Sequence, residues 1–254
     1  MGSPLRPTAE DSQLFSQLVG LQGGAARQVL ILGVTPELYA LPWPEGSTVR
    51  AVDRSPDMIR AIWPGPAENA VRGEWLNLPF GGDSFDTVLC DGGLHLLEYP
   101  TGHHQFAESV ARVLTPGGLF ALRLFARPET AESEVSVWES LKANQLSNFH
   151  EFKLRVLMAL QENPVDGIQV SRVEQAIRLH IGCDFARLAK ETRWPLEEIL
   201  TLESYRDSPN VYHLLTVKES LAALTQGGHL RFETQLQGTY PLAEQCPVVL
   251  LRKM

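Results

Sequence analysis

The sequence predicts a doubly wound α/β fold, with a mostly parallel sheet and a helical insertion before its last two strands. Between about residues 28 and 126, short apolar runs alternate with segments that carry apolar residues at helical spacing. From about residue 128 to 227 one helical pattern follows another, and the final stretch returns to strands. Strands that are buried on both faces and joined by helices indicate a parallel sheet.

The elements follow from local composition. The strands of the first half are runs of β-branched and large apolar residues, at 28–33 (QVLILG), 48–53 (TVRAVD), 86–91 (DTVLCD) and 119–125 (LFALRLF). The helices between them are expected at 55–63 and 104–114, and the later ones at 133–145, 148–161, 171–180, 194–205 and 212–226. The closing strands are expected at 229–238 and 246–253, separated by a loop short enough for an antiparallel pair.

We therefore expect three segments. Residues 1–127 would form an N-terminal helix and a ligand-binding α/β core, and residues 128–227 a helical lid over the substrate. Residues 228–254 would return to the core as its closing strand pair.

Charge and composition limit the function. The net charge of -8, from 22 Lys+Arg and 30 Asp+Glu, argues against nucleic acid or an anionic membrane as partner. The apolar runs are too short to cross a membrane, and the polar N-terminus lacks a signal-peptide core, so we expect a cytoplasmic protein. The cysteines Cys90, Cys183 and Cys246 are isolated, which predicts buried thiols, and no metal site is expected.

The first strand ends at Gly33, and a helix is expected to begin almost at once. Thr35 can cap that helix with its hydroxyl, and Pro36 suits the first helical position, where its missing N–H costs nothing. Free backbone donors at a helix start favour an anionic ligand. The same residues would also serve simply to begin a helix.

The next two strand ends carry groups that suit a nucleoside. Asp53 follows Gly33 by about twenty residues, a spacing at which a carboxylate can accept hydrogen bonds from both ribose hydroxyls. The alternative is an exposed aspartate before a turn. Glu74 and Trp75, in the segment 73–80 (GEWLNLPF), offer an acceptor and a flat apolar face that suit adenine.

The fourth strand ends in Asp91. Two glycines follow it and would let a ligand approach the backbone closely. His95 is expected to begin the next helix, where it would either face the ligand or merely cap or pack.

In order and spacing, these motifs resemble those of the class I S-adenosylmethionine-dependent methyltransferases, especially the small-molecule branch. The run 49–59 (VRAVDRSPDMI) is similar to the second motif of that family, and 73–97 (GEWLNLPFGGDSFDTVLCDGGLHLL) to its third and fourth. The run 111–125 (ARVLTPGGLFALRLF) resembles the fifth-strand signature. The resemblance covers residues 28–126 and implies a seven-stranded Rossmann-like sheet and S-adenosylmethionine as cofactor.

The resemblance also implies residue roles. Asp53 would bind the ribose, Glu74 the adenine amine and Trp75 the ring, while Asp91 and Gly92 would border the methionine part. Asp91 or His95 would act as catalytic base if the acceptor must lose a proton. The full cofactor-binding set expected is Gly33, Val34, Thr35, Glu37, Asp53, Arg54, Met58, Glu74, Trp75, Leu76, Asp91 and Gly92, with Met58 either on the adenine or in the core.

The first motif departs from the family pattern. An acidic residue is usual where Ile31 stands, and further glycines where Thr35 and Glu37 stand. Glu37 would either repel the cofactor carboxylate, by about 4 kcal/mol at 4 Å, or pair with its ammonium group. We interpret the loop as an altered cradle that still works.

The main hypothesis is a methyltransferase for a small molecule, such as a secondary metabolite. The alternatives are an enzyme that transfers or cyclises the aminocarboxypropyl part of the cofactor, and a non-catalytic binding protein. Arg123 and Arg127 would hold a carboxylate substrate or form surface salt bridges. The helical block would cover the acceptor, and it is equally suited to a homodimer interface.

Overall fold

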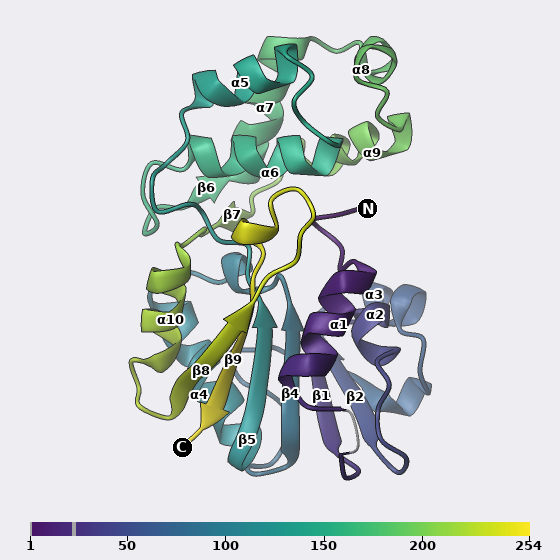
Figure 1. Ribbon diagram of the computed structural model, residues 1–254, viewed down its shortest axis with the longest axis vertical. Coiled ribbons are helices and arrows are strands. Elements are labelled where there is room, and N and C mark those ends of the chain that lie inside the picture. Colours follow the sequence, from purple (N-terminus) through teal and green to yellow (C-terminus); the bar gives the residue numbers. More distant parts are fainter. Residues whose placement is uncertain (1, 22–23) are drawn as a thin grey trace.

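The computed structural model describes residues 2–21 and 24–254. A seven-stranded sheet in the order β3-β2-β1-β4-β5-β9-β8 forms the lower part of the molecule (Figure 1). Its strands are β1 (Gln28–Leu32), β2 (Thr48–Asp53), β3 (Ala70–Arg72), β4 (Phe85–Asp91), β5 (Leu114–Arg123), β8 (Leu230–Leu236) and β9 (Val248–Lys253). The first five pair in parallel, whereas β9 runs antiparallel to both β5 and β8. The doubly wound sheet and its closing antiparallel pair are thus confirmed.

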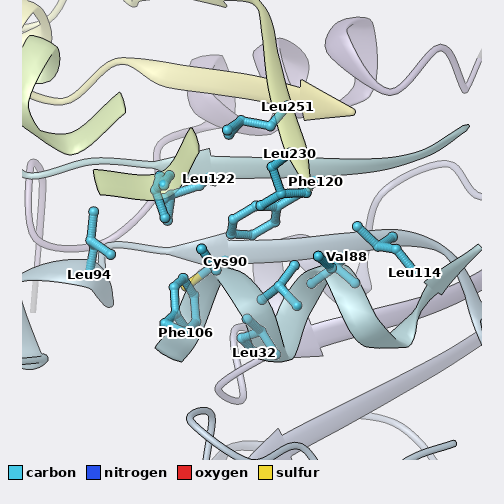
Figure 2. Close-up of a cluster of buried hydrophobic side chains, with 14 of the residues drawn as sticks. Leu32, Val88, Cys90, Leu94, Phe106, Leu114, Phe120, Leu122, Leu230 and Leu251 are labelled. Atoms are coloured by element: carbon cyan, nitrogen blue, oxygen red, sulfur yellow. The ribbon is translucent and has the colours of Figure 1, made fainter. Parts of the chain in front are cut away.

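Helices cover both faces of this sheet. Those that pack against it are α1 (Ala9–Leu18), α2 (Pro36–Tyr39), α3 (Pro56–Ile62), α4 (Thr101–Val113) and α10 (Val217–Thr225). One core lies between the sheet and the pair α4 and α10, and Figure 2 shows Phe106 of α4 facing side chains such as Cys90 and Leu32. The opposite face is covered by α1, from which Phe15 is fully buried, and by α2. The central strands β1 and β4 are buried on both faces, which accounts for their continuous apolar runs in the sequence, whereas the edge strands β3 and β8 are largely exposed.

A separate helical layer lies above the carboxyl ends of the parallel strands (Figure 1). It consists of α5 (Glu134–Lys142), α6 (Phe149–Leu160), α7 (Val170–Ile181), α8 (Phe185–Thr192), α9 (Leu196–Leu200), the 3-10 turn η3 (Thr201–Tyr205) and a small sheet of β6 (Ile168–Gln169) and β7 (Val211–Tyr212). These elements share their own apolar core, in which Phe149, Phe152 and Trp194 are packed together. The layer therefore lies over the edge of the sheet at which ligands bind in open α/β folds.

Some sequence expectations were wrong in detail. The helix expected at 212–226 begins only at Val217, because residues Val211–Tyr212 pair with β6 instead. His95 lies in a short 3-10 turn, η2 (Leu94–Leu96), and the long helix α4 starts later, at Thr101. Of the cysteines expected to be buried, Cys90 and Cys246 are buried but Cys183 is exposed. In the described part of the chain, no helix has both the length and the apolar character needed to cross a membrane.

Two buried histidines predispose the fold to acid unfolding. His103 and His150 are fully buried, and neither ring nitrogen of His150 has a hydrogen-bond partner among the described residues. Burial lowers the pKa of each to about 4, against an ordinary value of about 6.5. Below pH 6.5 the unfolded chain therefore binds more protons than the folded one, and stability falls as the pH approaches 4.

We expect each of these histidines to lower the free energy of unfolding by about 2 kcal/mol at pH 5 relative to pH 7.5. Urea unfolding of His150→Phe at both pH values checks this. The variant should lose less stability on acidification than the unmodified chain by about that amount. Equal losses in the two proteins would show that His150 does not contribute.

Candidate active site

The turn after β1 is built differently from the expectation. Gly33 has a φ of 90°, a conformation that favours glycine, and its N–H donates to the carbonyl of Val52 at 2.8 Å. Helix α2 begins at Pro36 as expected, but it is only four residues long and the Thr35 hydroxyl makes no capping hydrogen bond. The expected hydroxyl cap is therefore wrong, and the Gly33 N–H is not available to a ligand, because it already donates to Val52.

A cavity of about 270 Å³ lies beside the ends of β2 and β3; we call it the strand-end cavity. Its wall includes five residues of the expected cofactor set, which are Asp53, Arg54, Glu74, Trp75 and Leu76, and residues that follow η2. Among the described residues neither Asp53 nor Glu74 forms an ion pair, and Asp53 uses only Oδ1, which accepts from the Ser55 N–H at 2.8 Å. Two carboxylates therefore remain available beside an apolar wall.

The indole of Trp75 lies between the ends of β1 and β4. Its Nε1 donates to the Val52 carbonyl at 3.2 Å, and its ring packs on Phe106 at a centroid distance of 6.1 Å. A Cβ added at Gly93 would lie 2.3 Å from this ring, and one at Gly33 would lie 3.6 Å from it. Gly93 therefore accommodates the chain's own tryptophan, where the sequence suggested room for a ligand.

Gly92 and Asp91 are enclosed in a similar way. A Cβ at Gly92 would lie 2.7 Å from the ring of Phe125. The Asp91 carboxylate is 8% exposed and accepts a hydrogen bond from Arg123 Nε at 2.5 Å. Burial raises the pKa of Asp91, and the Arg123 guanidinium opposes that rise. In this arrangement Asp91 is held in an ion pair and is not free to take a proton from an acceptor.

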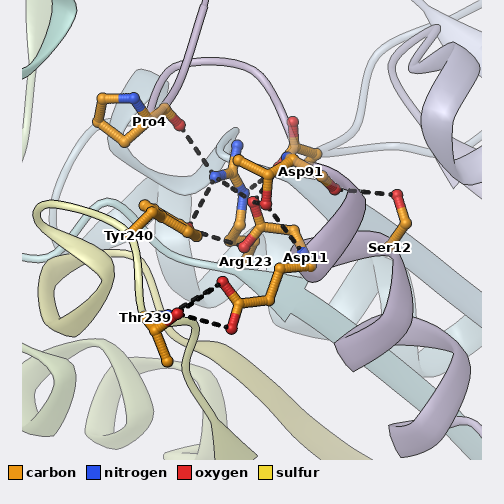
Figure 3. A network of polar contacts seen from close by, with 9 residues as sticks. Pro4, Asp11, Ser12, Asp91, Arg123, Thr239 and Tyr240 are labelled. Carbon is orange, nitrogen blue, oxygen red and sulfur yellow. Dashed lines mark hydrogen bonds and ion pairs between the residues drawn. The ribbon is translucent and has the colours of Figure 1, made fainter. Parts of the chain in front are cut away.

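Arg123 is fully buried at the centre of a polar network (Figure 3). Besides Asp91 it contacts the Pro4 carbonyl at 2.9 Å and Asp11 Oδ2 at 3.3 Å. The Tyr240 hydroxyl donates to the other oxygen of Asp11 at 2.7 Å. The cation expected to hold a substrate carboxylate is instead paired with two carboxylates of the chain. Arg127 likewise pairs with Glu219, at 3.1 Å.

The N-terminal segment closes this side of the site. Arg6 forms an ion pair with the partly exposed Glu37, so that Glu37 does not need a ligand ammonium for charge balance. Thr8 and Asp11 form a capping box at the start of α1, with the Asp11 N–H donating to the Thr8 hydroxyl at 3.1 Å. The Thr-x-x-Asp pattern in the sequence signalled this helix start, but nothing in the sequence indicated its contact with Arg123.

A second cavity, of about 300 Å³, lies between the core and the helical layer; we call it the interlayer cavity. His95 and Leu96 line it from η2, Lys153 from α6, and Tyr205 and Tyr212 from elsewhere in the layer. Leu96 also lines the strand-end cavity, so the two cavities adjoin. Sequence reasoning missed Lys153, although its place three and four residues from Val156 and Phe149 put a charge on an apolar helix face.

His95 was expected to serve as a base. Burial lowers its pKa to about 3, and Nδ1 has no hydrogen-bond partner among the described residues. The ring packs against Phe125 and Tyr212 at centroid distances of 5.2 and 4.8 Å. His95 is therefore neutral and better suited to a hydrogen bond with a ligand than to holding a proton.

Seven residues of the expected set line neither cavity: Gly33, Val34, Thr35, Glu37, Met58, Asp91 and Gly92. Met58 is 47% exposed on α3, and Val34 is buried in the core beneath the first turn. In the described ranges, no three His, Cys, Asp or Glu side chains come together in a way that could hold a metal ion.

Comparison with known proteins shows which proteins this chain resembles. Residues 30–122 match the family model described as a methyltransferase domain. An uncharacterized methyltransferase of Synechocystis is 39% identical over 84 residues, which are 33% of this chain and 39% of that protein. The match thus spans about two fifths of the relative's length.

Solved structures share the fold. An S-adenosylmethionine-dependent methyltransferase from Mesorhizobium loti aligns with a TM-score of 0.55 and 17% identity, over 97% of this chain and 98% of that one. The 1,6-didemethyltoxoflavin-N1-methyltransferase of Burkholderia thailandensis, solved with 1,6-didemethyltoxoflavin and S-adenosylhomocysteine, aligns with a TM-score of 0.51 and 16% identity, over 97% and 80%.

Residues 30–122 thus resemble a methyltransferase domain, and the chain has the fold of S-adenosylmethionine-dependent methyltransferases. The cofactor of this family is S-adenosylmethionine. The strand-end cavity fits the adenosine part, since Asp53 and Glu74 offer acceptors for hydroxyl and amine groups. The methionine part does not fit without movement, because the Trp75 indole lies between Gly33 and Gly93.

Proposed function

We propose that this protein is a methyltransferase that acts on a small molecule, with adenosine in the strand-end cavity and the acceptor in the interlayer cavity. The observation that carries the proposal is that the two cavities adjoin at Leu96, beneath a helical layer. The Burkholderia neighbour supports it, because its name describes methylation of a small heterocycle. Cofactor binding would require the Trp75 indole to leave its place between Gly33 and Gly93.

S-adenosylmethionine, when bound, supplies a methyl group on a positively charged sulfur. The protein's own contribution is to hold the acceptor in place and to exclude water. Leu96 separates the two cavities, and the neutral His95 can orient a polar atom of the acceptor beside it. The helical layer above provides the cover.

Asp53 is the residue whose role in cofactor binding is easiest to test. We expect Asp53→Ala to weaken S-adenosylhomocysteine binding by about 1.5–3 kcal/mol, because hydrogen bonds from the ribose hydroxyls to a charged group are lost. Asp57→Ala is the matched control, since Asp57 is a nearby carboxylate on α3 that lies outside the strand-end cavity, with a side chain that is 84% exposed. Titration calorimetry of both folded variants measures their affinities for S-adenosylhomocysteine. Equal affinities of the two variants would show that Asp53 does not contribute to cofactor binding.

Product analysis separates methyl transfer from the alternative chemistry. Methyl transfer leaves S-adenosylhomocysteine, whereas transfer or cyclisation of the aminocarboxypropyl group leaves methylthioadenosine. The non-catalytic alternative is favoured by one observation, the enclosed positions of Trp75 and Asp91, and it requires that neither form of the cofactor binds.

A further inference from the structure

Lys153 is a charged residue in an apolar place. It lies on α6 with only 3% of its surface exposed and lines the interlayer cavity. Its Nζ donates to the Thr201 hydroxyl at 3.2 Å and lies 4.7 Å from the centre of the Tyr205 ring. Within the part of the chain that the structure describes, no carboxylate lies within 4 Å of it.

A buried ammonium without an anionic partner is costly. Removing a charge from water costs several kcal/mol unless an opposite charge or several hydrogen bonds compensate. One hydroxyl, the faces of Tyr205 and Phe149, and the charge of Glu198, which lies beyond ion-pair distance but still raises the pKa of Lys153, offset only part of this cost. Burial lowers the pKa of Lys153 to about 8, so the side chain is still largely protonated at pH 7. Because none of the carboxylates in the described part of the chain is in direct contact with Lys153, an anionic ligand in this cavity would stabilise the ammonium further.

The lining of the interlayer cavity indicates which kind of anionic ligand would fit beside Lys153. The cavity volume of about 300 Å³ is at the small end of sites that hold small molecules. The aromatic residues Phe125, Tyr205 and Tyr212 line the cavity, and most other lining side chains are leucines. Flat aromatic walls favour a planar aromatic ligand.

Besides the hydroxyl groups of Thr201, Ser204, Tyr205 and Tyr212, the cavity is lined by two nitrogen-bearing side chains, which come from opposite layers. Lys153 belongs to the helical layer, and His95 to η2 at the carboxyl end of β4. His95 is next to Leu96, which borders the strand-end cavity. A ligand paired with Lys153 at one end would thus present its other end to His95 and the cofactor side.

We propose that the interlayer cavity binds a planar aromatic anion, with its carboxylate or phenolate oxygen on Lys153 and its reacting end toward Leu96. The assignment of this anion as the methyl acceptor rests on the proposed function. The binding site itself rests only on the cavity and on the unpaired ammonium.

Calorimetric titration with benzoate and with its neutral counterpart benzamide tests the charge requirement, in the absence of any cofactor. We expect benzoate to bind at least tenfold more tightly than benzamide. Lys153→Met should remove this preference, while Lys190→Met, a change at an exposed lysine of the same layer, should keep it. Equal binding of the two compounds to the unmodified protein, or an unchanged preference in Lys153→Met, would overturn the proposal.

Lys153→Met is expected to fold, because replacing a buried charge by an apolar side chain of similar volume is often neutral or stabilising. A second probe, 4-nitrophenol, reports the anion directly, since only its phenolate absorbs visible light. Below the pKa of the free phenol, adding the unmodified protein should increase the phenolate absorbance, and adding Lys153→Met should not. No increase with the unmodified protein would count against an anion-stabilising site.

The methyltransferase proposal and the proposed anion site at Lys153 can be refuted independently of each other. Titration of Lys153→Met with S-adenosylhomocysteine should match the unmodified protein, because Lys153 lines only the interlayer cavity. Benzoate binding without S-adenosylhomocysteine binding would refute the methyltransferase proposal and leave the anion site standing. The reverse result would refute the anion site alone.

Discussion

Trp75→Ala is expected to tighten the binding of S-adenosylhomocysteine about tenfold or more, while it lowers the free energy of unfolding by about 3 kcal/mol. The indole fills the space between Gly33 and Gly93, so a ligand must displace it, and the apparent affinity falls by the cost of that displacement. Stability falls because the ring also packs against Phe106 of the core. Calorimetry and urea unfolding measure the two effects.

Trp43→Ala is the matched control for this experiment. Its indole is also partly buried, and its Nε1 also donates to a backbone carbonyl, that of Leu38 at 3.3 Å, but it lies outside both cavities. This variant should lose stability without any gain in affinity. If Trp75→Ala bound the ligand no better than the control, the idea that Trp75 obstructs the site would be wrong.

Arg123→Met is expected to lower the free energy of unfolding by about 3–5 kcal/mol, because Asp11 and Asp91 would stay buried without their cation. Chemical unfolding followed by circular dichroism measures the loss. Arg127→Met is a suitable comparison, since Arg127 and Glu219 are 20% and 35% exposed and such a pair contributes at most about 1 kcal/mol. Similar small losses in both variants would show that the Arg123 network does not hold the N-terminal segment in place.

Neutralising a carboxylate should partly rescue the first variant. In Arg123→Met with Asp91→Asn, one of the two unpaired charges is absent, so the double variant should be more stable than Arg123→Met alone. An additional loss of stability in the double variant would contradict the view that unpaired charge causes the damage.

The strands and the gathering of polar groups at their ends could be predicted because both depend on short-range patterns. Runs such as 29–32 are apolar throughout, and the carboxyl ends of parallel strands meet at one edge. Asp53, Glu74 and Trp75 were therefore expected together, and the structure places all three on one cavity. Their roles toward the cofactor stay predictions.

The arrangement of the side chains in the site could not be predicted, because it depends on contacts between residues that are far apart in the sequence. The orientation of the Trp75 ring is decided by the absence of a Cβ at Gly93, a residue on another strand end. The pairing of Arg123 with Asp11 joins residues more than a hundred positions apart. Lys153 was missed because a lysine in an amphipathic helix is usually exposed. Its burial follows only from the way in which the two layers pack together.

A crystal structure of the protein grown with saturating S-adenosylhomocysteine is the most direct test of the cofactor site. We expect the ribose against Asp53, the adenine beside Glu74, and the Trp75 indole moved out of the space between Gly33 and Gly93. A structure in which the strand-end cavity holds no nucleoside, and Trp75 keeps its hydrogen bond to Val52, would contradict this function for the site.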